Sequence, residues 1–301
     1  MVYKMKKWLR GSIPALVTPL EEDGGLDEKS FRRLISRALS SGCRGVMILG
    51  SCGEGVVVDQ KTFDHAVEAA RDESRDKGIL IVSTGAASVQ RVKENIRSAK
   101  QHGADAVLNI PPMYFDETQQ AMKEYFLRLA EFSELPTMIY NIPSVTKNNM
   151  EAQTLIDLSG HDNIVGLKDS SGNHITFQRV VQETKDREFS VFVGRAPLIC
   201  ASMQTGAAGS MSPIPNLDPD LDLNIHRYLN AGETQKAIDL QIKVAKITSL
   251  FSYKNMSINV NLKGLLCALG LCKPYTAGFD PVLSEDEGEL LKQRYLEIIQ
   301  A

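Results

Sequence analysis

The sequence predicts an α/β fold in which eight strand-helix units close into a parallel (β/α)₈ barrel, the TIM-barrel architecture, with a C-terminal helical extension. Three observations support this prediction. Short apolar runs rich in β-branched residues recur as far as Met211, amphipathic segments separate them, and only helical patterns follow. The length of 301 residues is one that α/β barrels commonly use for a single domain.

The apolar runs are the expected strands. Most are apolar at successive positions, which is typical of parallel strands covered on both faces. An open doubly wound sheet has the same pattern, but the number of strand-helix units favours the closed barrel. The expected strands are residues 13–17, 45–49, 79–83, 106–110, 137–141, 164–168, 191–193 and 208–211.

The segments between the strands have apolar residues at positions i, i+3, i+4 and i+7, which form one face of an α-helix. Several end at glycine, which adopts the left-handed conformation of a helix C-cap without steric strain. These glycines are Gly42, Gly78, Gly103 and Gly206. The clearest helical segments are residues 28–40, 62–75, 89–100 and 119–131.

The chain after the eighth strand contains more helix than one strand-helix unit requires. The expected helices are residues 220–230, 234–250, 256–269 and 284–299. Because no Pro/Gly/Ser-rich linker precedes them, we expect one domain over residues 1–301. It comprises a barrel over residues 11–225 and C-terminal helices packed on the barrel over residues 226–301.

Composition excludes several classes of partner. The formal net charge is −3, so there is no excess of basic residues to bind a nucleic acid or an anionic membrane surface. No stretch approaches the roughly 20 apolar residues that span a bilayer, and no apolar signal segment follows the basic N-terminus. We therefore expect a cytoplasmic protein without nucleic-acid or membrane partners.

Metal and disulfide sites are also not expected. The five cysteines are odd in number and form no CxxC pair, which argues against a disulfide framework or structural zinc. The five histidines show no i, i+4 spacing typical of metal ligands on a helix. The sequence predicts no metal and no cofactor.

Lys168 ends the apolar run of the sixth expected strand. Reactive side chains of such barrels project from the carboxyl ends of the strands. An amine placed there has little water around it, which favours its neutral form, and a neutral amine attacks carbonyl carbons. The alternative is a lysine at the barrel rim that pairs with an acid.

Hydroxyl groups end three other expected strands, or follow them closely. Tyr140, Ser51 and Tyr114 are the residues concerned. Hydroxyls that converge on an amine pass the protons that imine formation needs at several steps. Each tyrosine alone is equally explained as a packed side chain with a satisfied hydroxyl.

The loop from Gly50 to Gly53 follows the second strand and offers backbone amides that bulky side chains do not hinder, a shape suited to a carboxylate. It matches neither GxGxxG nor GxxxxGK[ST], so a nucleotide phosphate loop is not expected. Lys263, on a late helix in an apolar context, is expected to be structural rather than a second catalytic amine.

From about Gly11 onward, the chain resembles the N-acetylneuraminate lyase and dihydrodipicolinate synthase superfamily of class I pyruvate-dependent aldolases. Three motifs in the expected order carry this resemblance. They are Gly50-Ser51-x-Gly53-Glu54, Tyr140-Asn141-Ile142-Pro143 and Gly166-x-Lys168-Asp169-Ser170-Ser171-Gly172.

The resemblance implies a role for each matching residue. Lys168 would form the Schiff base, Tyr140 would act as acid and base, and Ser51 with Tyr114 would complete a proton relay, Tyr114 serving a neighbouring subunit. Further implied substrate-binding residues are Gly50, the amides of Ser51 and Cys52, Met211 over the bound imine, and Gly194. The resemblance also implies a homotetramer arranged as a dimer of dimers.

Three positions depart from the family patterns. Val145 stands where the synthase pattern has an arginine that holds the carboxylate of aspartate semialdehyde. Arg195 follows Gly194 where sialic acid lyases have an acidic pair. Arg195 is a candidate cation for a second carboxylate or a phosphate, or else a solvated or intersubunit residue. Cys52 replaces threonine or asparagine and is expected to be a small buried residue rather than a reactive thiol.

The function predicted first is a Schiff-base lyase that reversibly splits a 2-oxo-3-deoxy or 4-hydroxy-2-oxo acid into pyruvate and an aldehyde. A dehydratase acting through the same imine is a variant of it. The alternative is a 4-hydroxy-tetrahydrodipicolinate synthase that condenses pyruvate with aspartate semialdehyde. A third possibility is a non-catalytic sensor of 2-oxo acids, against which Lys168 and Tyr140 argue.

Overall fold

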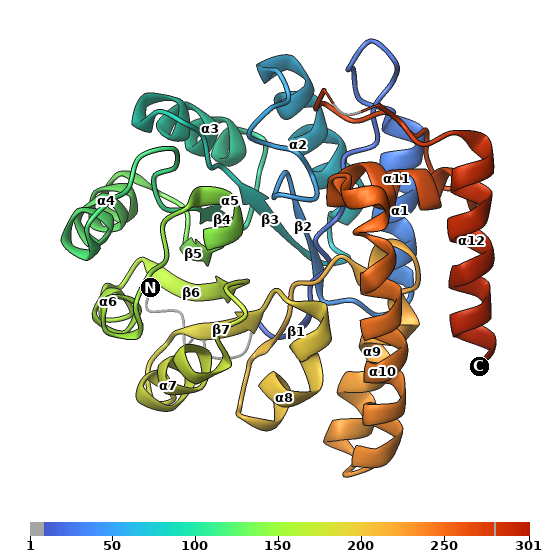
Figure 1. Ribbon diagram of the computed structural model, residues 1–301. Helices are drawn as coiled ribbons and strands as arrows, with labels where there is room; N and C mark the ends of the chain where they lie inside the picture. The colour runs from blue at the N-terminus through green and yellow to red at the C-terminus, as the bar shows by residue number, and fades with distance from the viewer. Residues whose placement is uncertain (1–8, 280) are drawn as a thin grey trace.

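A computed structural model describes residues 9–279 and 281–301, and it confirms the barrel. Eight parallel strands follow the order β1-β8-β7-β6-β5-β4-β3-β2, and a parallel bridge between Ala15 and Met47 brings the first strand to the second. The ring is therefore nearly closed (Figure 1). The strands are β1 Gly11–Ser12, β2 Gly45–Ile48, β3 Ile79–Ser83, β4 Ala106–Asn109, β5 Thr137–Asn141, β6 Ile164–Asp169, β7 Ser190–Val193 and β8 Gly209–Ser210.

Helices surround the strands, as Figure 1 shows. The helices of the barrel are α1 Glu28–Ser40, α2 Gln60–Ser74, α3 Val89–Gln101, α4 Gln119–Phe132, α5 Pro143–Thr146, α6 Ala152–Leu158, α7 His174–Thr184, α8 Ile199–Gln204 and α9 Pro219–Asn230. Helices α1, α3 and α4 begin at the predicted residues, and α2 begins two residues earlier than predicted. At each start Asp27, Asp59, Ser88 or Thr118 accepts a hydrogen bond from a backbone N–H of the first turn.

Strand β1 differs most from the prediction. Residues 13–17 were expected, whereas regular pairing covers Gly11–Ser12 and resumes only as the bridge at Ala15. Between them lies Pro14, whose nitrogen has no hydrogen to donate toward β2, although its carbonyl accepts from Met47 N at 2.8 Å. The proline therefore interrupts the ladder without turning the chain away from the barrel.

Three of the four predicted C-cap glycines have the positive φ that motivated the prediction: Gly42, Gly103 and Gly206. Gly78 does not, and after α2 the left-handed residue is Asp76, with φ 61°. Gly78 is needed for space instead, since a Cβ there would lie 2.5 Å from Leu39 Cδ2.

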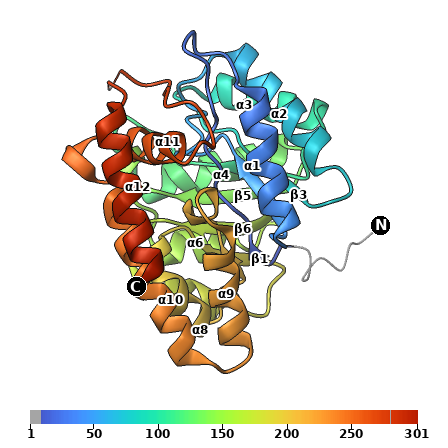
Figure 2. The same ribbon diagram turned by 90° about the vertical axis from the view of Figure 1, so that its right-hand side faces the viewer.

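The last three helices are α10 Thr234–Leu250, α11 Ile258–Ala268 and α12 Glu285–Gln300. They lie together on one side of the barrel, and α10 packs beside α9 (Figures 1 and 2). Helix α9 continues through the expected boundary between the barrel and the C-terminal helices, at residues 225 and 226. That the chain forms a single domain stays a prediction. Within the described ranges, no helix combines the length and apolarity needed to cross a bilayer.

The barrel interior is a packed cluster rather than a pore. Its side chains come from every strand or its continuation, and we call this set the inner cluster. The inner cluster contains Leu9, Ile13, Ala15, Met47, Ile81, Ala106, Leu108, Ile110, Met138, Tyr140, Ile142, Val165, Phe192 and Met211. Two larger clusters fill the space between the strands and the helices.

We predict that Phe192→Ala lowers the free energy of unfolding by about 3–5 kcal/mol, because Phe192 has no exposed surface and its removal leaves a cavity in the inner cluster. The matched control is Phe279→Ala, since that ring is fully exposed and should change stability by less than about 0.5 kcal/mol. Urea unfolding of both variants measures the difference. Equal losses would contradict a close-packed interior.

Candidate active site

Strands β5 and β6 pair residue by residue at their carboxyl ends. Tyr140 lies opposite Lys168, and Asn141 lies opposite Asp169. The Lys168 side chain is buried, with 3% of its surface exposed, and its Nζ lies 4.1 Å from the centroid of the Tyr140 ring. The predicted amine and phenol are therefore neighbours inside the barrel.

An irregularity at the start of β6 determines that Lys168 faces inward. Thr137 pairs with Ile164 but Met138 pairs with Gly166, so Val165 is an extra residue on β6. A shift of one residue exchanges the two faces of a strand. If β6 continued in regular register from Ile164, Lys168 would lie opposite Asn141 and would point toward the helices.

The outward neighbours form a second, polar pair. Asn141 Nδ2 donates to Asp169 Oδ1 at 2.9 Å, and Ser171 Oγ donates to Asp169 Oδ2 at 2.9 Å. Burial raises the pKa of the Asp169 carboxyl, although these hydrogen bonds act in the opposite direction. Neither Asn141 nor Asp169 was predicted as a site residue, although both adjoin one in the sequence motifs.

Gly194 leaves the space that Lys168 occupies. A Cβ on Gly194 would lie 2.1 Å from Ser170 Oγ and 3.1 Å from Lys168 Cε. Its amide donates to Asp169 O at 2.7 Å, which fixes the end of β7 against β6. Met211 is fully buried in the inner cluster with Tyr140, and its amide donates to Val193 O at 2.8 Å.

The loop after β2 is tightly folded. Leu49 and Glu54 have φ values of 58° and 56°, in the left-handed region. Gly53 packs so closely on Leu49 that a Cβ would lie 2.6 Å from Leu49 N. Two distant side chains hold the loop: Thr18 Oγ1 donates to Gly53 O at 2.7 Å, and Asn259 Nδ2 donates to Ser51 O at 3.0 Å.

A cavity of about 390 Å³ opens between this loop, the end of β5 and the C-terminal part of the chain. Of the predicted site residues, Gly50, Ser51 and Tyr140 line it. Its other described lining residues are Glu54, Val56, Val57, Ser83, Ile110, Met113, Val145, Ser257, Ile258, Asn259, Thr276 and Gly278. No lysine or arginine is among them, so the described wall offers no cation.

Cys52 lies close enough to Lys168 for the two to interact electrostatically. Burial raises the pKa of the Cys52 thiol, and this effect outweighs the opposing one of the Lys168 charge. A thiol with a raised pKa stays protonated and is a poor nucleophile. The side chain is partly exposed rather than buried as expected, and its raised pKa favours a thiol that is not a reactive nucleophile.

Six predicted site residues are not among those that line this cavity: Lys168, Cys52, Met211, Gly194, Tyr114 and Arg195. Tyr114 is 83% exposed, has φ 85° and packs its ring edge-to-face on Phe115. Arg195 is exposed, donates through Nε to Ser170 O at 3.0 Å, and lies by a small hollow lined by Asp169 and His174. The described chain brings neither side chain to the cavity wall.

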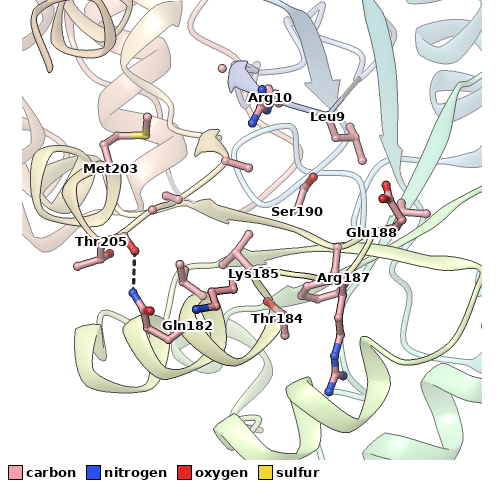
Figure 3. Close-up of a pocket in the computed structure, with 18 of the residues that line it drawn as sticks. Leu9, Arg10, Gln182, Thr184, Lys185, Arg187, Glu188, Ser190, Met203 and Thr205 are labelled. Atoms are coloured by element: carbon pink, nitrogen blue, oxygen red, sulfur yellow. Dashed lines mark hydrogen bonds between the residues drawn. The ribbon is translucent and has the colours of Figure 1, made fainter. Parts of the chain in front are cut away.

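A larger cavity of about 750 Å³ lies at the opposite end of the barrel, where β1, β7 and β8 begin (Figure 3). Its wall includes Arg10, Lys185 and Glu188. Barrel enzymes place their chemistry at the carboxyl ends of the strands, so the smaller cavity is the candidate active site. Among the described residues, no three His, Cys, Asp or Glu side chains form a group able to hold a metal ion.

Comparison with known proteins agrees with this geometry. The profile of the dihydrodipicolinate synthetase family matches residues 8–296. This chain belongs to that family. The family consists of pyruvate-dependent carbon–carbon lyases and synthases that act through a Schiff base.

A 4-hydroxy-tetrahydrodipicolinate synthase of Polynucleobacter asymbioticus is 30% identical over 276 residues, 91% of this chain and 88% of the relative. The dihydrodipicolinate synthase structure from Bacteroides thetaiotaomicron has a TM-score of 0.90 and 28% identity, covering 96% of this chain and 98% of that one. A prophage protein of the family from E. coli K12, solved in complex with pyruvate, has a TM-score of 0.91 over 97% of this chain and 99% of that one. At 23% identity it supports the fold alone.

We predict that Gly194→Ala lowers kcat/KM about tenfold, because the new Cβ would displace Ser170 Oγ and would push Lys168 Cε by a few tenths of an ångström, whereas a shift of about 1 Å at a reacting group costs about 100-fold. The matched control is Gly288→Ala on α12, where the added Cβ meets only ordinary contacts at 3.4 and 3.6 Å. Steady-state kinetics of both variants test the prediction. Unchanged activity in the first would show that Lys168 is not confined.

Proposed function

We propose that this chain joins pyruvate to an aldehyde, and splits the product, through an imine between pyruvate and Lys168. The observation that carries the proposal is the buried amine of Lys168 beside the ring of Tyr140. The amine attacks the keto carbon of pyruvate and water leaves, giving the imine. Loss of a methyl proton gives an enamine, whose carbon attacks the aldehyde carbonyl. The resulting alkoxide takes up a proton, and water hydrolyses the new imine, which releases the product and the Lys168 amine.

The proposed roles follow from position. Tyr140 exchanges protons with the reacting oxygens, since its ring adjoins Lys168 and it lines the cavity. Backbone amides at Ser51 and Cys52 bind the pyruvate carboxylate, and Gly50, Gly194 and Met211 shape the imine site. Tyr114 completes the relay from a neighbouring subunit, a role its outward direction supports.

The aldehyde that we propose is aspartate semialdehyde, which makes the reaction 4-hydroxy-tetrahydrodipicolinate synthesis. The names of curated relatives about 30% identical over most of the chain support this alternative better than the lyase predicted first. Val145 lines the cavity in place of the expected arginine, so another cation must hold the second carboxylate. We propose Arg195, which also lies at the carboxyl end of the barrel and whose side chain would have to turn from Ser170 O to reach the cavity.

The sugar-acid or 4-hydroxy-2-oxo-acid lyase stays the second candidate. The observation that favours it is the cavity wall, in which Val56, Val57, Val145 and Ile258 are all exposed and no cation is described. An uncharged aldehyde needs no ion pair there. We further propose a cytoplasmic homotetramer without nucleic-acid partners, metal or cofactor, and a single domain over the whole chain.

We predict that sodium borohydride with pyruvate adds the mass of one reduced pyruvate to the wild-type chain. Lys168→Arg should abolish the addition, because a guanidinium does not form the imine. Lys246→Arg, at an exposed position, is the matched control and should behave as wild type. Intact mass spectrometry is the measurement, and an unchanged wild-type mass would refute the proposed chemistry.

We predict that Val145→Arg raises kcat/KM for aspartate semialdehyde about tenfold, since a charge-assisted hydrogen bond to a carboxylate contributes ~1.5–3 kcal/mol. Val145→Ala controls for the change of shape.

If Arg195 already supplies the cation, Arg195→Met should raise KM for aspartate semialdehyde and leave KM for pyruvate unchanged. A wild type that turns over uncharged aldehydes in preference to aspartate semialdehyde would favour the lyase.

A further inference from the structure

Two opposite charges are buried directly behind the loop that carries Ser51. Lys263, on α11, has a side chain with no exposed surface, and the Glu54 side chain is 3% exposed. Lys263 Nζ lies 2.5 Å from Glu54 Oε1. Glu54 follows Gly53 in the active-site loop and itself lines the cavity.

The pair joins three separate segments of the chain. Lys263 Nζ also donates to Tyr275 O at 2.9 Å, and Glu54 Oε2 accepts from Ala277 N at 2.7 Å. The segment they hold continues into Thr276 and Gly278, which form part of the cavity wall. Loop, helix and wall are therefore fixed by one buried ion pair.

The same helix contacts the loop a second time. Asn259 lies four residues before Lys263 on α11, so both side chains project from one face of the helix. Asn259 Nδ2 donates to Ser51 O, as described above. The two contacts attach α11 to both ends of the segment from Ser51 to Glu54, to which the proposed function assigns the pyruvate carboxylate.

Stability alone gives a poor account of this arrangement. A buried ion pair loses hydration that its mutual attraction barely recovers, and well-packed apolar side chains often stabilise such a position equally well. Burial lowers the pKa of Lys263, and the nearby Glu54 charge opposes that change. The Lys263 amine is also bonded to Glu54 and Tyr275 O, so it is not available as a second nucleophile.

We propose that Glu54, Lys263 and Asn259 are positioning residues that hold the Ser51–Glu54 segment in the shape that binds the pyruvate carboxylate. The C-terminal extension is then a working part of the active site rather than an added layer on the barrel. This inference rests on the proposed function, because it assigns the carboxylate of pyruvate to that loop.

The first test uses Lys263→Met, Glu54→Gln and the double variant. Lys263→Met leaves a buried carboxylate unpaired and should lower Tm strongly. The double variant removes both charges and should recover much of the lost Tm. Because a methionine side chain donates no hydrogen bond, the double variant loses the contacts from residue 263 to Tyr275 O and to residue 54, and only the Asn259 contact still joins α11 to the loop. It should therefore still have a KM for pyruvate about tenfold above wild type, with KM for the aldehyde unchanged.

Asn259→Ala provides a second variant that leaves no buried charge and is expected to fold. It should also raise KM for pyruvate, by a smaller factor. The matched control is Lys254→Met, which removes an exposed pair with Glu287 outside the cavity and should leave both KM values unchanged.

The outcomes separate the two proposals. If wild type forms no borohydride-trapped adduct with pyruvate, the proposed function fails. If wild type forms the adduct, and the folded double variant and Asn259→Ala keep the wild-type KM for pyruvate, then the positioning role is wrong and the Schiff-base function stands. A rise in KM for pyruvate, without a matching rise for the aldehyde, supports the positioning role.

Discussion

The pairing of β5 with β6 is the constraint on which the site depends. One register brings Tyr140 to Lys168 inside the barrel and Asn141 to Asp169 outside it. The inner pair needs a dry, crowded setting, whereas the outer pair satisfies a buried carboxylate with hydrogen bonds. Because both pairs share the same ladder, a slip by one residue would lose the chemistry and bury an unsatisfied charge.

The C-terminal helices support a part of the site that the pairing of β5 with β6 does not reach. A (β/α)₈ barrel positions strand-borne groups well, but its loops lack the ladder that holds Tyr140 and Lys168. The loop after β2 instead gains its shape from Thr18 and from α11. A helix more than 200 residues later in the chain thus completes a site whose reactive groups all lie on the barrel.

Most of the fold could be predicted because the periodicity of the sequence is local: α1 and α10 have the predicted bounds. What could not be predicted depends on contacts between distant residues. The sequence predicts Pro14 within an apolar strand, because only the structure shows which backbone groups pair on either side of it. The apolar neighbours of Lys263 predict a structural residue, but its partner Glu54 could not be predicted, because only folding brings the two residues together.

The two proposed substrates, pyruvate and the aldehyde, differ in how far the sequence predicts the residues that bind them. In the proposed function, pyruvate is bound by groups on strands and on one tightly held loop, and these groups lie within the three sequence motifs that carry the family resemblance. The proposed aldehyde site is lined by side chains such as Val145 and Ile258, which are exposed, so their replacement should leave the barrel intact. One substituted side chain there changes which aldehyde is preferred by more than it changes stability. Membership of the family therefore determines the Schiff-base chemistry more firmly than it determines the acceptor.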